Sequence, residues 1–246
     1  QAVVKGFVTQ TACDDLVTIL TRGSTLFCDY DALESSLPAT RVFRNYPTAI
    51  KNRLGVSKGL RKRVETSQTL CLGPFNLRSD AHLLPAKSIV FPLGAVPKKS
   101  ADGSPLEEWR PTSDHTKSGF NSFSNPPSHS LSATIDVAHM LLPGYFMAVA
   151  DIHNAFALIP LNPKIWKYMF FAWYNVYDDT DDAIYLYANI FSDFGGAGTP
   201  EVFRMFFVDV LLNVARSECV ISPGRRVPTH VDDFSIIDED KEVVNK

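Results

Sequence analysis

The chain of 246 residues is poor in cysteine and histidine, and it contains no long apolar run. Its few cysteines are far apart and lack metal-ligand spacing; they are Cys13, Cys28, Cys71 and Cys219. This pattern argues against a disulfide framework and indicates free thiols of an intracellular, reducing compartment, with nucleus, cytoplasm and organelle left open. The six histidines are scattered, which argues against a zinc site. Because no segment reaches the roughly 18 apolar residues that span a bilayer, and no signal peptide opens the chain, we expect no membrane partner.

An excess of positive charge is also missing, since the formal net charge is -3. Free-standing nucleic-acid enzymes are often basic. The positive charge that is present is concentrated between Arg41 and Glu65, where Glu65 is the single acid. We predict that this stretch follows a nucleic-acid backbone, and a solvated helical face is the alternative. The predicted nucleic-acid-binding residues are Arg53, Lys58, Arg61, Lys62 and Arg63.

What stands out in the chain is a pair of adjacent aspartates, Asp232 and Asp233, inside an apolar run that reads as a buried strand. Two buried like charges cost several kcal/mol unless cations or hydrogen bonds compensate. Asp151 ends a second apolar run of strand length. If the two strands pair at the centre of one sheet, three carboxylates converge and could hold two Mg2+ ions. A turn at the aspartate pair is the alternative.

Two further segments suit a phosphate-bearing ligand. A Gly-rich stretch, 192–200, precedes residues 201–216, where apolar side chains recur at helical spacing. The backbone can therefore approach a ligand just before a helix begins. Residues 97–111 contain an Asp-Gly pair typical of a hairpin tip. The cations on this predicted hairpin, which would suit a triphosphate, are Lys98, Lys99 and Arg110.

In their order along the chain, these motifs resemble the fingers and palm of reverse transcriptases, and those of DIRS-like retrotransposons in particular. Residues 151–156 are similar to the first catalytic motif, 194–203 to the template and nucleotide motif, and 231–233 to the Val-Asp-Asp signature. The resemblance runs from about Tyr46 to Ile237 and covers most of the chain.

The resemblance implies an α+β polymerase right-hand fold. It consists of a palm, with a central antiparallel sheet packed on helices, and a fingers subdomain, and we expect the thumb to be absent. We expect an N-terminal extension of unknown role over 1–37, fingers over 38–125 and palm over 126–246, with the hairpin 96–112 contributing to the nucleotide site. The expected palm strands are 145–151, 167–174, 183–191 and the segments flanking the Asp232-Asp233 pair.

The resemblance also implies a reaction, the template-directed addition of deoxynucleotides to a primer 3'-hydroxyl with two Mg2+ ions as cofactors. The implied catalytic residues are Asp151, Asp232 and Asp233. The implied metal-site residues are Asp151, Ile152, Asp232 and Asp233. The implied nucleotide-binding residues are Lys98, Lys99, Arg110, Phe156, Phe194 and Gly195. Of these, Phe156 would stack beneath the incoming sugar and block a 2'-hydroxyl.

The implied partners are an RNA template, a DNA or RNA primer, deoxynucleotide triphosphates, and further domains of a polyprotein or a larger ribonucleoprotein. Because only 13 residues follow Asp233, we expect either a fragment of a longer protein or a truncated, domesticated relic. Such a relic would act as a non-catalytic structural or RNA-binding subunit. A viral RNA-dependent RNA polymerase fits less well, because that class carries Gly rather than Val before Asp-Asp and lacks a bulky residue at Phe156.

Several positions depart from the reverse-transcriptase pattern. His230 stands where the family has Tyr, Asn154 where a second acid is frequent, and Thr116 where a basic residue is common. Ser192 and Asp193 replace a Leu-Pro pair and bring a negative charge near a site that must receive phosphates. We expect Asp193 to cap the loop or to turn outward.

Overall fold

The computed structural model describes residues 6, 8–100, 103–128, 134–217, 227–230 and 233–244. The chain divides into two compact units. Unit 1 consists of Gln1–Thr21, Pro127–Ala155 and Pro200–Lys246, and unit 2 consists of Arg22–Pro126 and Phe156–Thr199. The domain boundaries predicted at residues 37 and 125 stay predictions.

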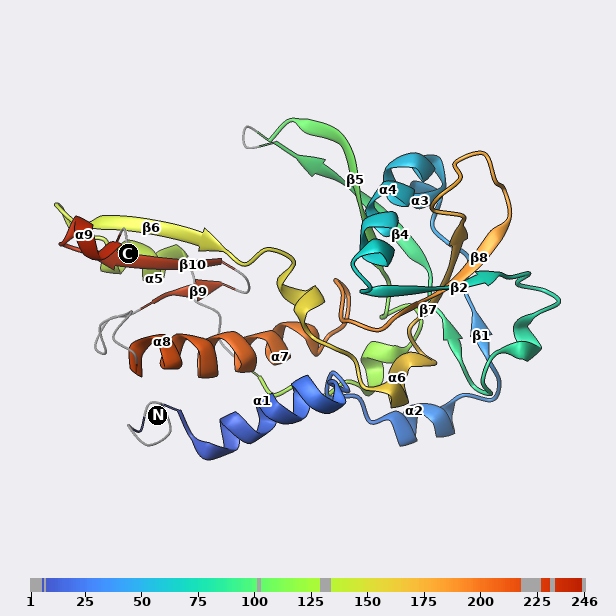
Figure 1. Cartoon of the computed structure of the whole chain (residues 1–246), viewed down its shortest axis with the longest axis horizontal. Helices are drawn as coiled ribbons and strands as arrows, with labels where there is room; N and C mark the ends of the chain where they lie inside the picture. The colour runs from blue at the N-terminus through green and yellow to red at the C-terminus, as the bar shows by residue number, and fades with distance from the viewer. Residues whose placement is uncertain are drawn as a thin grey trace. The chain divides into compact units, whose positions relative to one another are not determined.

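A five-stranded mixed sheet with the strand order β1-β3-β7-β8-β2 organises unit 2 (Figure 1). Its strands are β1 (Arg41–Val42), β2 (Thr69–Pro74), β3 (Ile89–Val90), β7 (Phe170–Tyr174) and β8 (Ile184–Asn189). β3 pairs in parallel with β1 and β7, whereas β8 pairs antiparallel with β7 and β2. β7 reads as a continuous apolar run because its side chains are buried on both faces of the sheet.

Each face of this sheet has its own core. Phe170 and Ala172 point into one core cluster, which Phe75 and Leu186 complete. The alternate residue Phe171 points to the other face and stacks on Tyr187, with ring centroids 5.2 Å apart. On that face, Trp173 Nε1 donates a hydrogen bond to Ser57 Oγ at 2.9 Å. Ser57 belongs to α4 (Arg53–Glu65), so this helix covers the second face.

The prediction placed strands 167–174 and 183–191 in the same palm sheet as the strand that ends at Asp151. The strands themselves are confirmed as β7 and β8, but their sheet membership is wrong. They pair with β2 and β3 in the sheet of unit 2, separately from the Asp151 strand. The physical reason is burial, because β7 needs apolar cover on both faces and the core cluster and α4 supply it.

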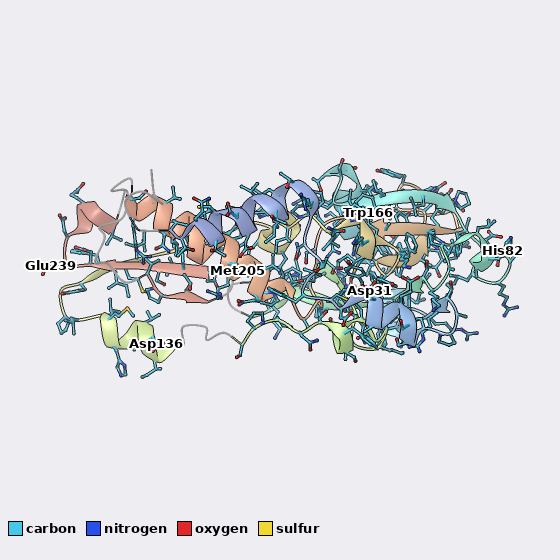
Figure 2. The ribbon with its side chains drawn as sticks, turned by 90° about the horizontal axis from the view of Figure 1, so that it is seen from below. Asp31, His82, Asp136, Trp166, Met205 and Glu239 are labelled. Carbon is cyan, nitrogen blue, oxygen red and sulfur yellow. The ribbon has the colours of Figure 1, made fainter. Side chains whose placement is uncertain are left out.

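The hairpin predicted over 96–112 is confirmed in unit 2, and its assignment to a fingers subdomain stays a prediction. β4 (Leu93–Lys99) and β5 (Pro105–Ser113) pair antiparallel, with Val96 opposite Arg110 and a register shift between Pro97 and Lys99. The remaining elements that lie in this unit are α2 (Tyr30–Ser36), α3 (Pro47–Lys51), η1 (Ala81–Leu83), η2 (Phe120–Phe123) and α6 (Pro163–Trp166). At the end of α6, Trp166 (Figure 2) donates its indole N–H to the Leu161 carbonyl at 2.8 Å. This bond closes the turn that leads into β7.

Unit 1 contains a three-stranded antiparallel sheet with the order β6-β10-β9. Its strands are β6 (Phe146–Asp151), β9 (Thr229–His230) and β10 (Asp233–Asp238). The helices are α1 (Gln10–Arg22), α5 (Thr134–Met140), α7 (Thr199–Phe206), the π-helical η4 (Phe207–Leu212), α8 (Asn213–Ser217) and α9 (Lys241–Val244). η3 (Ala155–Leu158) follows β6. α7, η4 and α8 run without a break, which confirms the helix predicted over 201–216 (Figure 1).

α1 lies beside α7 within unit 1. Leu16 and Ile19 of α1 and Met205 and Phe206 of α7 line one small cavity of about 160 Å³. Met205 is marked in Figure 2. None of the helices in the described ranges is long and apolar enough to cross a membrane.

The expectation of buried strands at the predicted metal-site aspartates is wrong for the described residues of β6 and β10. Within β6, Val149 keeps 61% of its surface exposed, and in β10 only Ile237 is buried. The reason is that neither face of β6 is fully covered by the described residues, since every residue of this strand is exposed or half-buried. Cys13, Cys28 and Cys71 are free thiols, as predicted. Cys219 lies outside the described residues.

Candidate functional site

The predicted pairing of the aspartate strands is confirmed in unit 1. Asp151 ends β6 and Asp233 begins β10, and the two are direct partners in the antiparallel register. Both residues are exposed. Side chains at such positions have Cβ atoms roughly 4.5–5.5 Å apart, and like charges placed there repel each other. Carboxylate oxygens are hard ligands, so the two side chains present the type of donor that Mg2+ prefers.

The other predicted members of the metal site are less fully described. Ile152 follows Asp151 directly and is half-buried. Asp232 lies outside the described residues. Within the ranges that are described, no group of three or more His, Cys, Asp or Glu side chains is placed to hold a metal ion. The structure therefore brings together two of the three predicted carboxylates.

Asn154 and His230 stand at two positions that depart from the family pattern. Asn154 has a left-handed backbone, with φ of 54°, and asparagine adopts this conformation more readily than most residues. Its side-chain nitrogen contacts His153 Nε2 at 2.9 Å. The left-handed backbone at residue 154 therefore explains why an asparagine stands at this position. His230 of β9 lies opposite Asp233 in the sheet.

Three of the predicted nucleotide-binding residues form a contact series in unit 2. The Arg110 guanidinium lies 5.2 Å from the centroid of the Phe194 ring. The Phe194 and Phe156 rings meet edge to face, with centroids 4.9 Å apart. Phe156 is only 8% exposed, whereas Phe194 is 40% exposed. The aromatic surface that this series presents to solvent therefore belongs mainly to Phe194.

The remaining predicted nucleotide residues lie on the hairpin and in the Gly-rich loop. Lys98 and Lys99 end β4, where Lys99 is exposed and Lys98 is half-buried. Gly195 has φ of 120°, and a Cβ atom at this position would lie 2.1 Å from the Ser113 carbonyl oxygen. The loop can approach β5 this closely only because residue 195 has no side chain.

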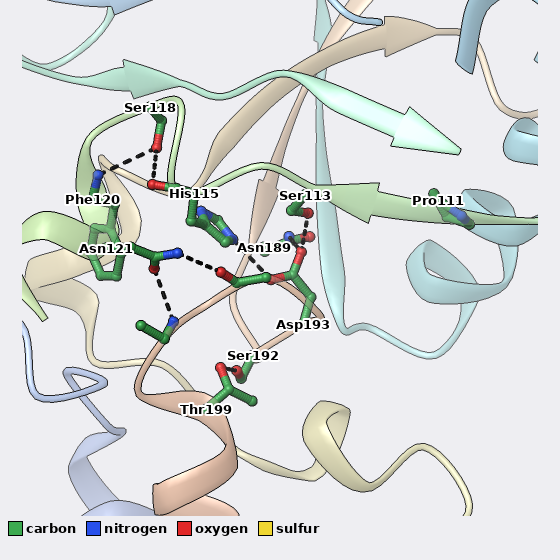
Figure 3. Close-up of polar contacts among 12 residues, drawn as sticks. Pro111, Ser113, His115, Ser118, Phe120, Asn121, Asn189, Ser192, Asp193 and Thr199 are labelled. Atoms are coloured by element: carbon green, nitrogen blue, oxygen red, sulfur yellow. Dashed lines mark hydrogen bonds and ion pairs between the residues drawn. The ribbon is translucent and has the colours of Figure 1, made fainter. Parts of the chain in front are cut away.

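Asp193 does not cap the loop or turn outward as expected. It is 8% exposed, and its carboxylate points into a polar network (Figure 3). Oδ2 accepts hydrogen bonds from Ser113 Oγ and from Asn189 Nδ2. Oδ1 lies 3.0 Å from His115 Nε2, and Arg63 Nη1 lies 3.8 Å from Oδ2. The negative charge is thus compensated inside the fold.

The network sets the charge state of Asp193. Burial by itself raises the pKa of this carboxyl, but the charge and hydrogen bond of His115, the charge of Arg63 and the Ser113 hydroxyl outweigh it. The pKa of Asp193 therefore lies below its ordinary value. Burial lowers the pKa of Arg63, and the Asp193 charge opposes that shift. No sequence pattern indicates Ser113, His115 or Asn189 as partners of Asp193, and the departure at Ser192-Asp193 is the one signal for this network.

The predicted nucleic-acid-binding residues all lie on α4, and they fall into two groups. The arginines have acidic or carbonyl partners in unit 2. Arg53 pairs with Asp182 and stacks on Tyr174, and Arg61 lies 3.6 Å from Asp179. Arg63 belongs to the Asp193 network. Lys58 and Lys62, one helical turn apart, are exposed.

Comparisons with known proteins bear on the fold. No protein-family model matches the chain, and no curated protein matches its sequence. Among solved structures, the chain is similar to the protease-reverse transcriptase of prototype foamy virus, with a TM-score of 0.53 and 16% sequence identity. The match covers 84% of this chain and 22% of the viral chain, so the chain spans about a fifth of that protein's length. The chain therefore has a mixed α+β fold similar to that of a reverse transcriptase.

Proposed function

We propose that this chain is a reverse-transcriptase-like polymerase domain that adds deoxynucleotides to a primer 3'-hydroxyl under the direction of an RNA template. The observation that carries the proposal is the direct cross-strand pair of Asp151 and Asp233 in a chain whose fold is similar to that of a reverse transcriptase. In this proposal unit 1 acts as a palm and supplies the carboxylates. Unit 2 acts as fingers and supplies the nucleotide contacts.

The carboxylates Asp151, Asp232 and Asp233, with Ile152, would hold two Mg2+ ions. When bound, the two ions would supply positive charge at the attacking and leaving oxygens of an in-line phosphoryl displacement. The protein itself would hold the carboxylates of Asp151 and Asp233 opposite each other, with their oxygens accessible to a cation. The strand register supports that task, because Asp151 and Asp233 are direct partners at the ends of their strands.

The cations of the β4–β5 hairpin would neutralise the triphosphate. Arg110 suits this task because a guanidinium forms paired hydrogen bonds to phosphate oxygens. Its contact with the Phe194 ring, at 5.2 Å, also restricts the position of the guanidinium. Lys98 and Lys99 would add charge at the other strand of the hairpin. Phe156 and Phe194 would provide the apolar surface against which base and sugar lie.

The outward lysines of α4 would contact the nucleic-acid backbone. Lys62 is exposed, whereas Arg53 is half-buried and paired with Asp182. We expect Lys62→Gln to lower the slope of log binding constant against log salt by roughly 0.7 per lost phosphate contact on single-stranded RNA. Arg53→Gln is the matched control and should leave the slope unchanged. An equal loss in both variants would contradict the division of α4 into two groups.

The test of the proposed reaction is primer extension on an annealed RNA template with Mg2+ and deoxynucleotides. Wild type should extend the primer, and Asp151→Asn or Asp233→Asn should lower the rate by roughly a thousandfold or more, because several kcal/mol of transition-state stabilisation are lost. Glu239→Gln, which changes an exposed acid one residue after β10, is the matched control and should extend normally.

Failure of the wild type to extend, while the chain is folded and still binds RNA, would contradict the enzyme proposal. It would favour the alternative of a non-catalytic structural or RNA-binding subunit of a ribonucleoprotein. A rate in Asp151→Asn equal to that of Glu239→Gln would overturn the assignment of the carboxylates instead.

A further inference from the structure

Asp193 is a buried carboxylate for which the proposed reaction has no use. It comes immediately before Phe194 in the chain, and its partners come from separate segments of unit 2. Those partners are Ser113 at the end of β5, His115 in the following turn, Asn189 at the end of β8, and Arg63 of α4. Three of the four belong to helices or strands, so the network fixes Asp193 relative to β5, β8 and α4.

His115 contributes more than a single hydrogen bond. Its ring is buried between Phe91 and Phe120, at centroid distances of 4.6 and 5.8 Å. Nδ1 of the ring is buried and has no hydrogen-bond partner in the part of the chain that is described. The polar contact of this imidazole is therefore directed at Asp193, through Nε2.

The loop that follows Asp193 is fastened to the same segment. Asn121 donates from Nδ2 to the Gly195 carbonyl at 2.8 Å, and its Oδ1 accepts from the Ala197 N–H at 2.9 Å (Figure 3). Gly195 also lies directly against the Ser113 carbonyl. Residues 113–121 thus hold the loop 194–198 at several successive points, and Asp193 is the charged member of this attachment.

The position of this loop decides where the Phe194 ring lies. That ring is the exposed member of the series Arg110–Phe194–Phe156, and it covers Phe156. A displacement of the loop by about 1 Å would separate the ring from both neighbours, and displacements of this size alter catalysis strongly. A shifted Phe194 would also uncover the ring of Phe156, which the resemblance to reverse transcriptases assigns to the incoming sugar.

We propose that Asp193 is a positioning residue that holds the loop 194–198 against β5 and thereby fixes Phe194 over Phe156. Through that placement it sets the affinity for the incoming nucleotide and the preference for a deoxyribose over a ribose. The second part of this inference rests on the proposed function, whereas the first part does not.

The variant Asp193→Asn separates positioning from simple loss of folding. An amide has nearly the same shape and still accepts from Ser113 or Asn189, but it gives up the charge that pairs with His115 and Arg63. Asp80→Asn is the matched control, because Asp80 is also a hydrogen-bonded aspartate of unit 2 and contacts Asn76 and Ser79 rather than the loop.

Amide hydrogen exchange tests the attachment without requiring activity. We expect residues 194–199 to exchange about tenfold faster in Asp193→Asn than in wild type, as local opening becomes easier, while β7 keeps its protection. Asp80→Asn should leave the exchange of 194–199 unchanged. Equal protection of the loop in wild type and Asp193→Asn would overturn the proposal.

Steady-state primer extension tests the consequence for the nucleotide. We expect Asp193→Asn to raise KM for deoxynucleotide by about tenfold with a smaller change in kcat, and to lower the ratio of kcat/KM for deoxynucleotide over ribonucleotide by a similar factor. A purely structural role would reduce the active fraction, so kcat would fall while KM and the sugar preference stayed unchanged. That result would overturn the proposed effect of Asp193 on nucleotide affinity and sugar preference. If the wild type were inactive, the proposed function would fail, and the exchange experiment would still decide the attachment.

Discussion

Asp193 of unit 2 and the pair Asp151 and Asp233 of unit 1 are all aspartates in or beside predicted catalytic motifs, yet they have opposite surroundings. Asp151 and Asp233 are exposed and face each other across two strands. Asp193 is buried and has hydroxyl, amide, imidazole and guanidinium partners. The chemical group is the same, so the difference lies in what each environment allows the group to do.

A carboxylate that binds a cation or a phosphate-bearing substrate must keep its lone pairs open, at a cost in stability from the repulsion of its neighbour. A carboxylate that positions a loop gains from burial, because hydrogen bonds and ion pairs are stronger in a low dielectric. Comparable aspartates in one chain should therefore respond to substitution in opposite directions. Unit 1 should gain stability when its pair is neutralised, and unit 2 should lose stability when Asp193 is removed.

The largest expected effect comes from Asp193→Ala. This substitution removes the carboxylate oxygen that contacts the buried His115 ring and the counter-charge of the half-buried Arg63 guanidinium, and breaking a buried pair costs about 3–5 kcal/mol. We expect the free energy of unfolding of unit 2 to fall by that amount. Urea denaturation followed by tryptophan fluorescence measures it selectively, because all of the tryptophans lie in unit 2; they are Trp109, Trp166 and Trp173.

Asp179→Ala provides the control for this measurement. Asp179 is a half-exposed partner of Arg61, at 3.6 Å, and surface pairs of this kind contribute about 0–1 kcal/mol. If both alanine variants lowered the free energy of unfolding by the same small amount, the buried network would contribute no more than a surface ion pair.

Gly195→Ala should give the next largest effect. The added Cβ would lie 2.1 Å from the Ser113 carbonyl oxygen, and the φ of 120° is strained for any L side chain. Strain of this kind costs about 1–3 kcal/mol before the steric overlap is counted. The same fluorescence-detected urea denaturation measures the loss.

Gly103→Ala is matched to Gly195→Ala, because Gly103 also has positive φ, of 85°, but an added Cβ there meets no atom within 4 Å. The Gly103→Ala variant should therefore lose only the stability that the backbone strain costs, without a contribution from steric overlap. A cost for Gly195→Ala no greater than that for Gly103→Ala would mean that the loop is not held against β5.

The pH dependence of stability should also identify Asp193. Because its pKa is lowered in the folded chain, it contributes stability above the ordinary aspartate pKa of about 4, and this contribution is lost as the pH falls through the folded-state pKa. The difference in unfolding free energy between wild type and Asp193→Asn should therefore shrink as the pH falls from about 5 through the folded-state pKa, by roughly 1.4 kcal/mol for each unit of the shift. A difference that stays constant over this range would contradict the role of the charge.

Sequence patterns were sufficient wherever structure is decided locally. The hairpin around Gly103 and the helix over 201–216 follow from turn residues and from the spacing of apolar side chains, which involve neighbours in the chain. The pairing of the Asp151 strand with the strand of Asp233 was also predicted, because carboxylates in apolar runs of strand length need a cation or hydrogen bonds to compensate their charge.

The same patterns could not show which sheet a strand joins or where a polar side chain points. β7 has the apolar composition of any doubly buried strand, and its partners are chosen by tertiary packing. Asp193 points inward because of Ser113 and His115, which lie 80 and 78 residues earlier in the chain. Arg53 likewise pairs with Asp182, which lies 129 residues later in the chain. Long-range polar partners leave no periodic signal.

Neutralising one carboxylate of the Asp151–Asp233 pair should have the smallest effect on stability. It should raise stability, whereas the substitutions at Asp193 and Gly195 lower it. In Asp151→Asn the repulsion between opposed like charges disappears, so we expect the strands β6 and β10 to gain about 0.2–1 kcal/mol. Hydrogen exchange of their amides, compared with Glu239→Gln as an exposed acid outside the pair, measures this gain without tryptophan signals. A loss of protection in β6 and β10 would mean that Asp151 serves the fold rather than a ligand. Greater protection together with loss of primer extension would indicate instead that unit 1 gives up stability to keep two carboxylates open, the relation expected at a functional site.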